Sequence, residues 1–168
     1  MGHEPSFDPD RNLLTLAERR LVFHCHHYNV FLQRSIEDAL GEDALDVQVS
    51  AAAESAREML QRLWSSPSPF EARLTQAAAI FGQNGFGKAE LSELHAGGGR
   101  VRLATSHYAT GWQSRWGRSA RPVCHFATGF WAGALAAATG LAPERVRAVE
   151  ETCAAAGGET CCIRLEVR

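Results

Sequence analysis

The feature that most constrains this fold is a change of residue pattern near the middle of the chain. Before residue 86, apolar residues recur with the helical period, and the first such stretch lies between a capping box at Thr15 and Glu18 and a glycine at position 41. After residue 86, short runs rich in valine, leucine and threonine alternate with glycine clusters, a pattern typical of hairpins. The two halves together predict an α+β fold.

The same patterns set the approximate bounds of each element. A chain of 168 residues favours one domain, with a helical N-terminal region over residues 1–85 and an antiparallel sheet with a helix between its hairpins over residues 86–168. The expected helices cover 16–40, 46–64, 70–81 and 123–139, and the expected strands cover 89–94, 101–105, 145–153 and 160–167.

Charge and hydropathy exclude two classes of partner. The formal net charge is −2 and the arginines are spread along the chain, so neither nucleic acid nor an anionic membrane surface is an expected partner. The longest apolar stretch, residues 126–138, is shorter than the ~20 residues that a membrane-spanning helix needs. Because the N-terminus lacks the basic and apolar regions of a signal peptide, we expect a cytoplasmic, reducing location.

Four of the five cysteines follow residue 120, and in a reducing compartment such a cluster indicates metal binding or catalysis before it indicates disulfides. Side-chain alternation in the last strand predicts that Cys161 faces inward and Cys162 faces outward. The hairpin brings Cys153 close to Cys161, and Glu150 lies three residues before Cys153. Strict alternation would place Glu150 and Cys153 on opposite faces, so a shared site requires a bulge or a curl at the strand end.

With Cys124 at the start of the glycine-rich helix, these residues make a set of three thiolates and one carboxylate. Such a set closes a tetrahedral zinc shell and leaves no position open for water, so the site would be structural. The spacing alone equally allows Cys153 and Cys161 to be small core residues.

Four motifs in this part of the chain resemble the 4-vinyl reductase domain, a family of small-molecule-binding domains. The family includes the sensor domains of phenol-responsive bacterial transcription activators, and the match covers roughly residues 86 to 168. The motifs are Pro122-Val123-Cys124, Thr128-Gly129-Phe130-Trp131-Ala132-Gly133, Glu150-Glu151-Thr152-Cys153 and Gly158-Glu159-Thr160-Cys161.

The resemblance implies that Cys124, Glu150, Cys153 and Cys161 bind zinc. This chain is about three residues longer between Gly140 and Glu150, which leaves Glu151 as the alternative carboxylate. The resemblance further implies a small-molecule ligand, aromatic or tetrapyrrole-like, and a homodimer formed through the N-terminal region.

A histidine cluster lies within the first expected helix, where the helical period places His24 and His27 on one face. His107 follows the second hairpin strand and provides a third imidazole. Neutral imidazoles beside an apolar lining suit a polar ligand, a second metal or haem. The alternative is that these histidines bond to neighbouring segments or across a dimer contact. The candidate ligand-binding residues are His24, His27, Tyr28, His107 and Trp131.

Three functions remain compatible with the sequence. The first is a zinc-containing small-molecule-binding or sensory protein. The second is a metalloenzyme that uses a second metal or haem at His24, His26 and His27, with zinc structural. The third is a dimerising scaffold, because related folds occur in vesicle-tethering subunits. The sequence contains no Ser-His-Asp set, phosphate loop or dinucleotide fingerprint, so common hydrolases, kinases and Rossmann oxidoreductases are unsupported.

Overall fold

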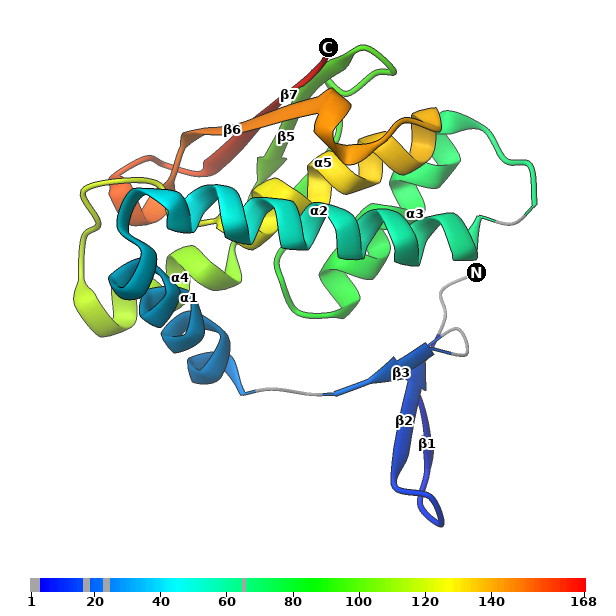
Figure 1. The fold of residues 1–168 in the computed structure, drawn as a ribbon, viewed down its shortest axis with the longest axis horizontal. Coiled ribbons are helices and arrows are strands. Elements are labelled where there is room, and N and C mark those ends of the chain that lie inside the picture. Colours follow the sequence, from blue (N-terminus) through cyan, green and yellow to red (C-terminus); the bar gives the residue numbers. More distant parts are fainter. Residues whose placement is uncertain (1–3, 17–18, 23–24, 65) are drawn as a thin grey trace.

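The computed structural model describes residues 4–16, 19–22, 25–64 and 66–168, and it has the expected α+β architecture (Figure 1). An N-terminal meander consists of β1 (Ser6–Asp8), β2 (Leu13–Leu16) and β3 (Arg19–Leu21). Three helices follow, namely α1 (His26–Leu40), α2 (Ala44–Leu63) and α3 (Phe70–Gln83). The rest comprises β4 (Ala89–Glu90), β5 (Gly98–Leu103), α4 (His107–Trp116), α5 (His125–Thr139), β6 (Val146–Thr152) and β7 (Cys161–Val167).

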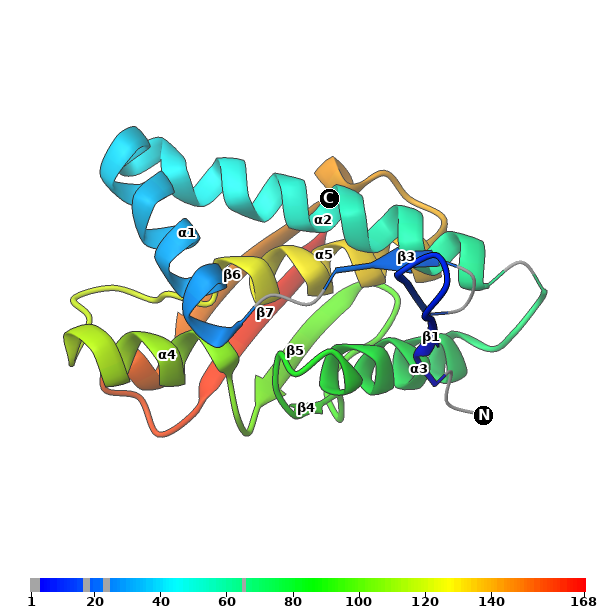
Figure 2. The ribbon, with the colours of Figure 1, turned by 90° about the horizontal axis from the view of Figure 1, so that it is seen from below.

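The main sheet is antiparallel with the strand order β4-β5-β7-β6. Its inner face is apolar, because β5 and β7 pair in a register that aligns Val101 with Ile163 and Leu103 with Cys161. Helix α5 packs beneath this face, and α2 packs along the other side of α5 (Figure 1). Figure 2 shows α1 and α4 side by side at one end of the molecule, close to the start of α5. The core therefore forms between the sheet and the helices.

Helix α5 is the centre of this core, and its glycines allow α2 to come close. A Cβ atom on Gly129 would lie 2.2 Å from the carbonyl oxygen of Val49, and one on Gly133 would lie 2.2 Å from that of Ala53. Both distances are far below van der Waals contact, so the two backbones are in contact along this surface. The i, i+4 spacing of the two glycines creates the groove that α2 fills.

The prediction of one helix over residues 16–40 was wrong, because strands occupy the first part of that range. The expected helix starts only at His26, and the backbone pairs Leu14 with Leu21 in an antiparallel ladder before it. A turn leads into this ladder: the carboxylate of Asp8 accepts hydrogen bonds from two following backbone N–H groups, and Asn12 adopts φ 51°, which together close the β1–β2 hairpin. Glu18 of the expected capping box lies outside the described residues.

Two smaller differences concern the middle of the chain. The first hairpin strand shortens to Ala89–Glu90, because the following residues turn, with the N–H of Leu94 donating to the carbonyl of Leu91. Helix α4 was not predicted; Ser106 caps it by accepting a hydrogen bond from the N–H of Ala109. Two helices, α4 and α5, therefore lie between the hairpins. No described helix is both long enough and apolar enough to cross a membrane.

Candidate metal centre and neighbouring pocket

Four residues from separate elements converge beneath one end of the sheet. Cys124 caps the N-terminus of α5, Glu150 lies on β6, Cys153 follows β6, and Cys161 begins β7. One ligand atom from each residue lies within 4.8 Å of those of the other three, so this buried group could hold a metal ion.

An irregularity in the sheet makes this convergence geometrically feasible. The pairing of β6 with β7 shifts between Glu150, which pairs with Ile163, and Thr152, which pairs with Cys162. The shift is the bulge that strict alternation required, and it directs Glu150 and Cys153 to the same side. Alternation along β7 places Cys161 inward, with 1% of its surface exposed, and leaves Cys162 partly exposed on the outer face.

The sulfur spacing suits a tetrahedral ion. The Sγ atom of Cys161 lies 3.5 Å from that of Cys124 and 4.0 Å from that of Cys153. Three thiolates at ~2.3 Å from a tetrahedral zinc ion are about 3.8 Å from one another, between these two distances. The N–H of Ala154 also points at the Sγ atom of Cys161 at 3.3 Å, an orientation that stabilises a thiolate.

Glu150 completes the group. Its Oε2 atom accepts a hydrogen bond of 2.8 Å from the N–H of Cys124, whereas its buried Oε1 atom has no hydrogen-bond partner among the described residues. Burial, followed by the nearby charge of Cys153, raises the pKa of Glu150 to about 8. A buried carboxyl group with an orphaned oxygen beside three sulfurs fits a cation that would stabilise its ionised form.

Glu151 is positioned quite differently. It lies on the outer face of the sheet, where its carboxylate forms ion pairs with Arg100 at 3.0 Å and Arg164 at 2.7 Å. The hydrogen bond from Arg100 is the largest of the effects that lower the pKa of Glu151. The structure therefore brings Glu150, and not Glu151, to the three cysteines.

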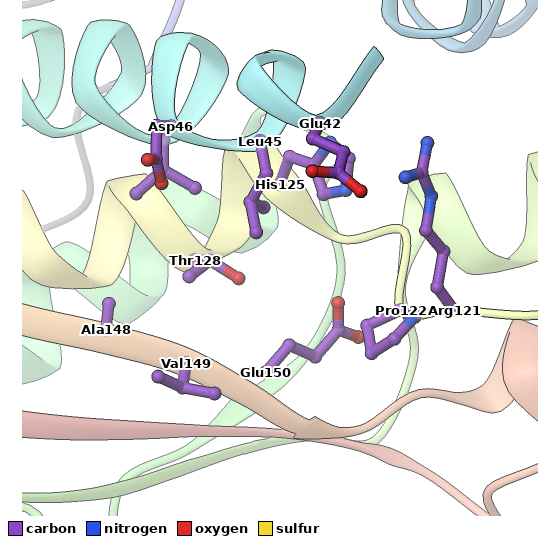
Figure 3. Close-up of a pocket in the computed structure, with 11 residues that line it drawn as sticks. Glu42, Leu45, Asp46, Arg121, Pro122, His125, Thr128, Ala148, Val149 and Glu150 are labelled. Atoms are coloured by element: carbon purple, nitrogen blue, oxygen red, sulfur yellow. The ribbon is translucent and has the colours of Figure 1, made fainter. Parts of the chain in front are cut away.

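A pocket of about 300 Å³ adjoins the metal-ligand group and shares Glu150 with it (Figure 3). The carboxylate of Glu150 projects from β6 into the space below Thr128 and beside Pro122, and His125 approaches from α5 (Figure 3). The pocket lies between the start of α2, the start of α5 and the middle of β6. Its lining residues are Glu42, Leu45, Asp46, Val49, Arg121, Pro122, His125, Thr128, Ala148, Val149 and Glu150.

A buried carboxylate on α1 holds the segment that carries Cys124. Glu37 accepts hydrogen bonds from Gln33 at 3.0 Å and from Arg121 at 3.3 Å, and Gln33 also donates to the carbonyl of Val123. The Nδ1 atom of His125 lies 3.6 Å from Glu37, and burial lowers the pKa of His125 although Glu37 opposes this shift. These contacts fix the wall of the pocket formed by residues 121–125 against α1.

The five candidate ligand-binding residues are not brought to one cavity. His24 lies outside the described residues, and His27 and Tyr28 are exposed on α1. His107 contacts His26 instead of His27, with their Nδ1 atoms 3.2 Å apart. Trp131 is fully buried against Phe81 and Phe130, at ring-centroid distances of 5.6 and 5.4 Å.

Sequence reasoning missed the pocket residues on the α2 side. Glu42 and Asp46 belong to an acidic stretch directly after Gly41, which was the available signal. Their position opposite β6 depends on tertiary packing and could not be inferred from that stretch. Of the two tryptophans on α4, Trp112 is buried and Trp116 is partly exposed.

Comparisons with known proteins identify the fold. No family model and no curated protein matches the sequence. Among solved structures, the phenol-responsive sensory domain of the transcription activator PoxR, solved with phenol, is similar with a TM-score of 0.78 and 18% identity, over 97% of this chain and 84% of that chain.

A vinyl-4-reductase family protein from Methanocaldococcus jannaschii is similar with a TM-score of 0.58 and 16% identity, over 88% of this chain and 83% of that chain. The chain therefore has the fold of the phenol-responsive sensory domain and of the vinyl-4-reductase family protein, as its motifs predicted.

Proposed function

We propose that this protein is a zinc-containing, small-molecule-binding module of the sensory type. The buried set of Cys124, Glu150, Cys153 and Cys161 is called the Cys3Glu group below. The observation that carries the proposal is that Glu150 belongs both to this group and to the lining of the pocket. A metal ligand that also lines a cavity links the binding of a small molecule to the most constrained part of the fold.

In this proposal, Cys124, Cys153, Cys161 and the Oε1 atom of Glu150 hold the ion. A zinc ion bound there supplies a cross-link between the start of α5 and the β6–β7 hairpin. Four protein ligands close the shell, so the zinc has a structural role. The fit rests on the sulfur spacing of 3.5 and 4.0 Å and on the orphaned carboxylate oxygen.

The pocket next to this centre is the proposed ligand site. Its volume of about 300 Å³ lies at the lower end of the usual range for small-molecule sites, which favours a single-ring ligand over a tetrapyrrole. Apolar side chains such as Leu45, Val49 and Ala148 suit an aromatic ring, and His125 and Thr128 offer polar contacts. The similar sensory domain of PoxR was solved with phenol, which supports a phenol-like ligand here.

A pair of neighbouring substitutions on β6 tests this site. Ala148 lines the pocket, whereas Arg147 is exposed. Ala148→Phe should fill the cavity and abolish the binding of phenols measured by calorimetry, while zinc content stays at that of the wild type. Arg147→Phe, which adds the same ring outside the pocket, should bind phenols as the wild type does. Equal binding by both variants would place the ligand elsewhere.

We further infer that the chain acts as a single domain that forms homodimers through α1. Large apolar side chains are exposed along this helix and at the start of α2. They include Phe31, Leu32, Leu40, Leu45 and Val47, each with at least 42% of its surface exposed. Exposed large apolar side chains gathered at the α1–α2 end of a fold are a feature of protein interfaces.

A further inference from the structure

A second group of metal-ligating side chains lies where α1 and α4 begin. His26 is the first residue of α1, and His107 is the first residue of α4. Their Nδ1 atoms are 3.2 Å apart, and their rings are nearly perpendicular, with an interplanar angle of 82°. This pair shares no residue with the Cys3Glu group, lies on other helices, and offers imidazole nitrogens instead of sulfur and carboxylate oxygen.

The fold holds the ring of His26 in place through a glycine. A Cβ atom on Gly111 of α4 would lie 2.8 Å from both Cε1 and Nε2 of His26. The imidazole therefore lies directly against the backbone of α4, in space that any other residue at position 111 would occupy. With that edge of the ring against α4, its Nδ1 atom is directed at His107.

His107 is held from the other side. Its backbone N–H donates to the carbonyl of Phe86 at 3.0 Å, and its ring lies edge-on to Tyr108 and Phe86 at centroid distances of 5.0 and 6.1 Å. Burial, followed by the charge of His26, lowers the pKa of His107, which favours the neutral imidazole over the charged form. The neutral imidazole is the form that binds metals.

The distance between the two nitrogens suits a shared metal ion. Two imidazole nitrogens at ~2.05 Å from one ion are about 3.4 Å apart at a tetrahedral angle and about 2.9 Å apart at a right angle. The observed 3.2 Å lies between these values. Such a pair needs little rearrangement to become a chelate, because both rings are already fixed by packing.

We propose that His26 and His107 form a second metal site, for a divalent ion of the imidazole-preferring class of zinc, cobalt, nickel and copper. The exposed ring of His27, with its centroid 5.4 Å from that of His26, is within reach as a third ligand. Unlike the closed Cys3Glu shell, this site leaves coordination positions open to water or to a small ligand. The ion also clamps α1 to α4.

Nickel titration tests the site directly. The experiment uses full-length protein without a histidine tag, in a Cys25→Ser background that removes the exposed thiol next to His26. We expect one Ni²⁺ equivalent by calorimetry in addition to the metal that is already bound. Loss of a residue that merely supports a metal ligand costs about 10–100-fold in affinity, so His26→Gln and His107→Gln should each weaken Ni²⁺ binding by at least that factor.

Two further variants distinguish Ni²⁺ binding at the proposed site from nonspecific Ni²⁺ binding to any exposed histidine. His95→Gln removes an exposed imidazole on a distant turn and should leave Ni²⁺ binding unchanged. Gly111→Ala keeps every histidine but displaces the ring of His26, and it should weaken Ni²⁺ binding as the glutamine variants do. Unchanged zinc content in all four variants would show that the Cys3Glu group is intact, so the two sites are tested independently.

If a variant does not fold, NMR spectroscopy of the protein without these substitutions still tests the site. Paramagnetic Ni²⁺ should selectively broaden the imidazole NMR signals of His26 and His107. Broadening confined to other histidines would overturn the proposal. So would the lack of an additional equivalent, or equal Ni²⁺ affinity in a folded His26→Gln/His107→Gln double variant.

Discussion

Glu150 takes part in both the metal-ligand group and the pocket. Its Oε2 atom accepts the hydrogen bond from the N–H of Cys124, its Oε1 atom is buried without a hydrogen-bond partner among the described residues, and its side chain forms part of the pocket lining. A ligand that displaced or polarised this carboxylate would act directly on the proposed zinc shell. Residue-scale changes around the metal centre should therefore affect metal binding, folding and ligand binding together.

Adjacent cysteines on β7 provide the sharpest comparison at this scale. Cys161→Ser should lose the metal and unfold the protein, because structural zinc binding contributes about 10–16 kcal/mol in small peptides, comparable with the ~5–15 kcal/mol stability of a whole domain. Cys162→Ser should keep metal and fold, because its thiol lies on the outer face. Circular dichroism and zinc analysis of the two proteins check both statements, and equal tolerance of the two serines would refute the site.

Alternation along β7 was sufficient to predict which of these two cysteines faces inward. The choice of Glu150 over Glu151 was not predictable to the same degree, because it depends on the register shift between Glu150 and Thr152. A bulge of this kind has no signature in the local sequence. The histidine pairing was missed for a related reason: His26 meets His107 through the packing of α1 against α4, which the local sequence does not specify.

At the scale of elements, the contact between α2 and α5 determines where the pocket and the metal centre lie. Gly133→Ala should destabilise the fold by about 1–3 kcal/mol or more, because its methyl group would overlap the backbone of Ala53. Gly82→Ala is the matched control. Its new methyl group would be 3.5 Å from the nearest atom, and alanine favours the helix by up to ~1 kcal/mol.

Urea unfolding of the two alanine variants measures this difference. A Gly133→Ala protein as stable as the wild type would show that α2 and α5 are farther apart than the structure places them.

Helices α2 and α3 were predicted nearly to their observed ends, because periodicity and the flanking proline and glycine signals agree there. The N-terminal meander was not predicted, because its apolar residues fit a helix as well as a hairpin. In the structure, the pairing of β2 with β3 uses the start of the range that the apolar period assigned to a helix.

At the scale of the whole molecule, the exposed apolar side chains of α1 and of the start of α2 predict self-association. We expect a homodimer at micromolar concentration by sedimentation, and Leu32→Glu should convert it to a monomer without loss of the fold, since Leu32 is 46% exposed. Ser55→Glu, at an exposed position of α2 about two turns beyond Val47, should remain dimeric. A wild-type protein that sediments as a monomer at this concentration would contradict the proposed interface.

We propose that a Cys3Glu group holds zinc at the junction of α5 and the β6–β7 hairpin. Zinc K-edge X-ray absorption tests this most directly, on protein purified without added metal and dialysed against a weak chelator to empty weaker sites. We expect about one zinc per chain, with three sulfur ligands at ~2.3 Å and one oxygen ligand at ~2.0–2.2 Å. A folded protein without zinc, or a zinc shell of nitrogen and oxygen only, would contradict it.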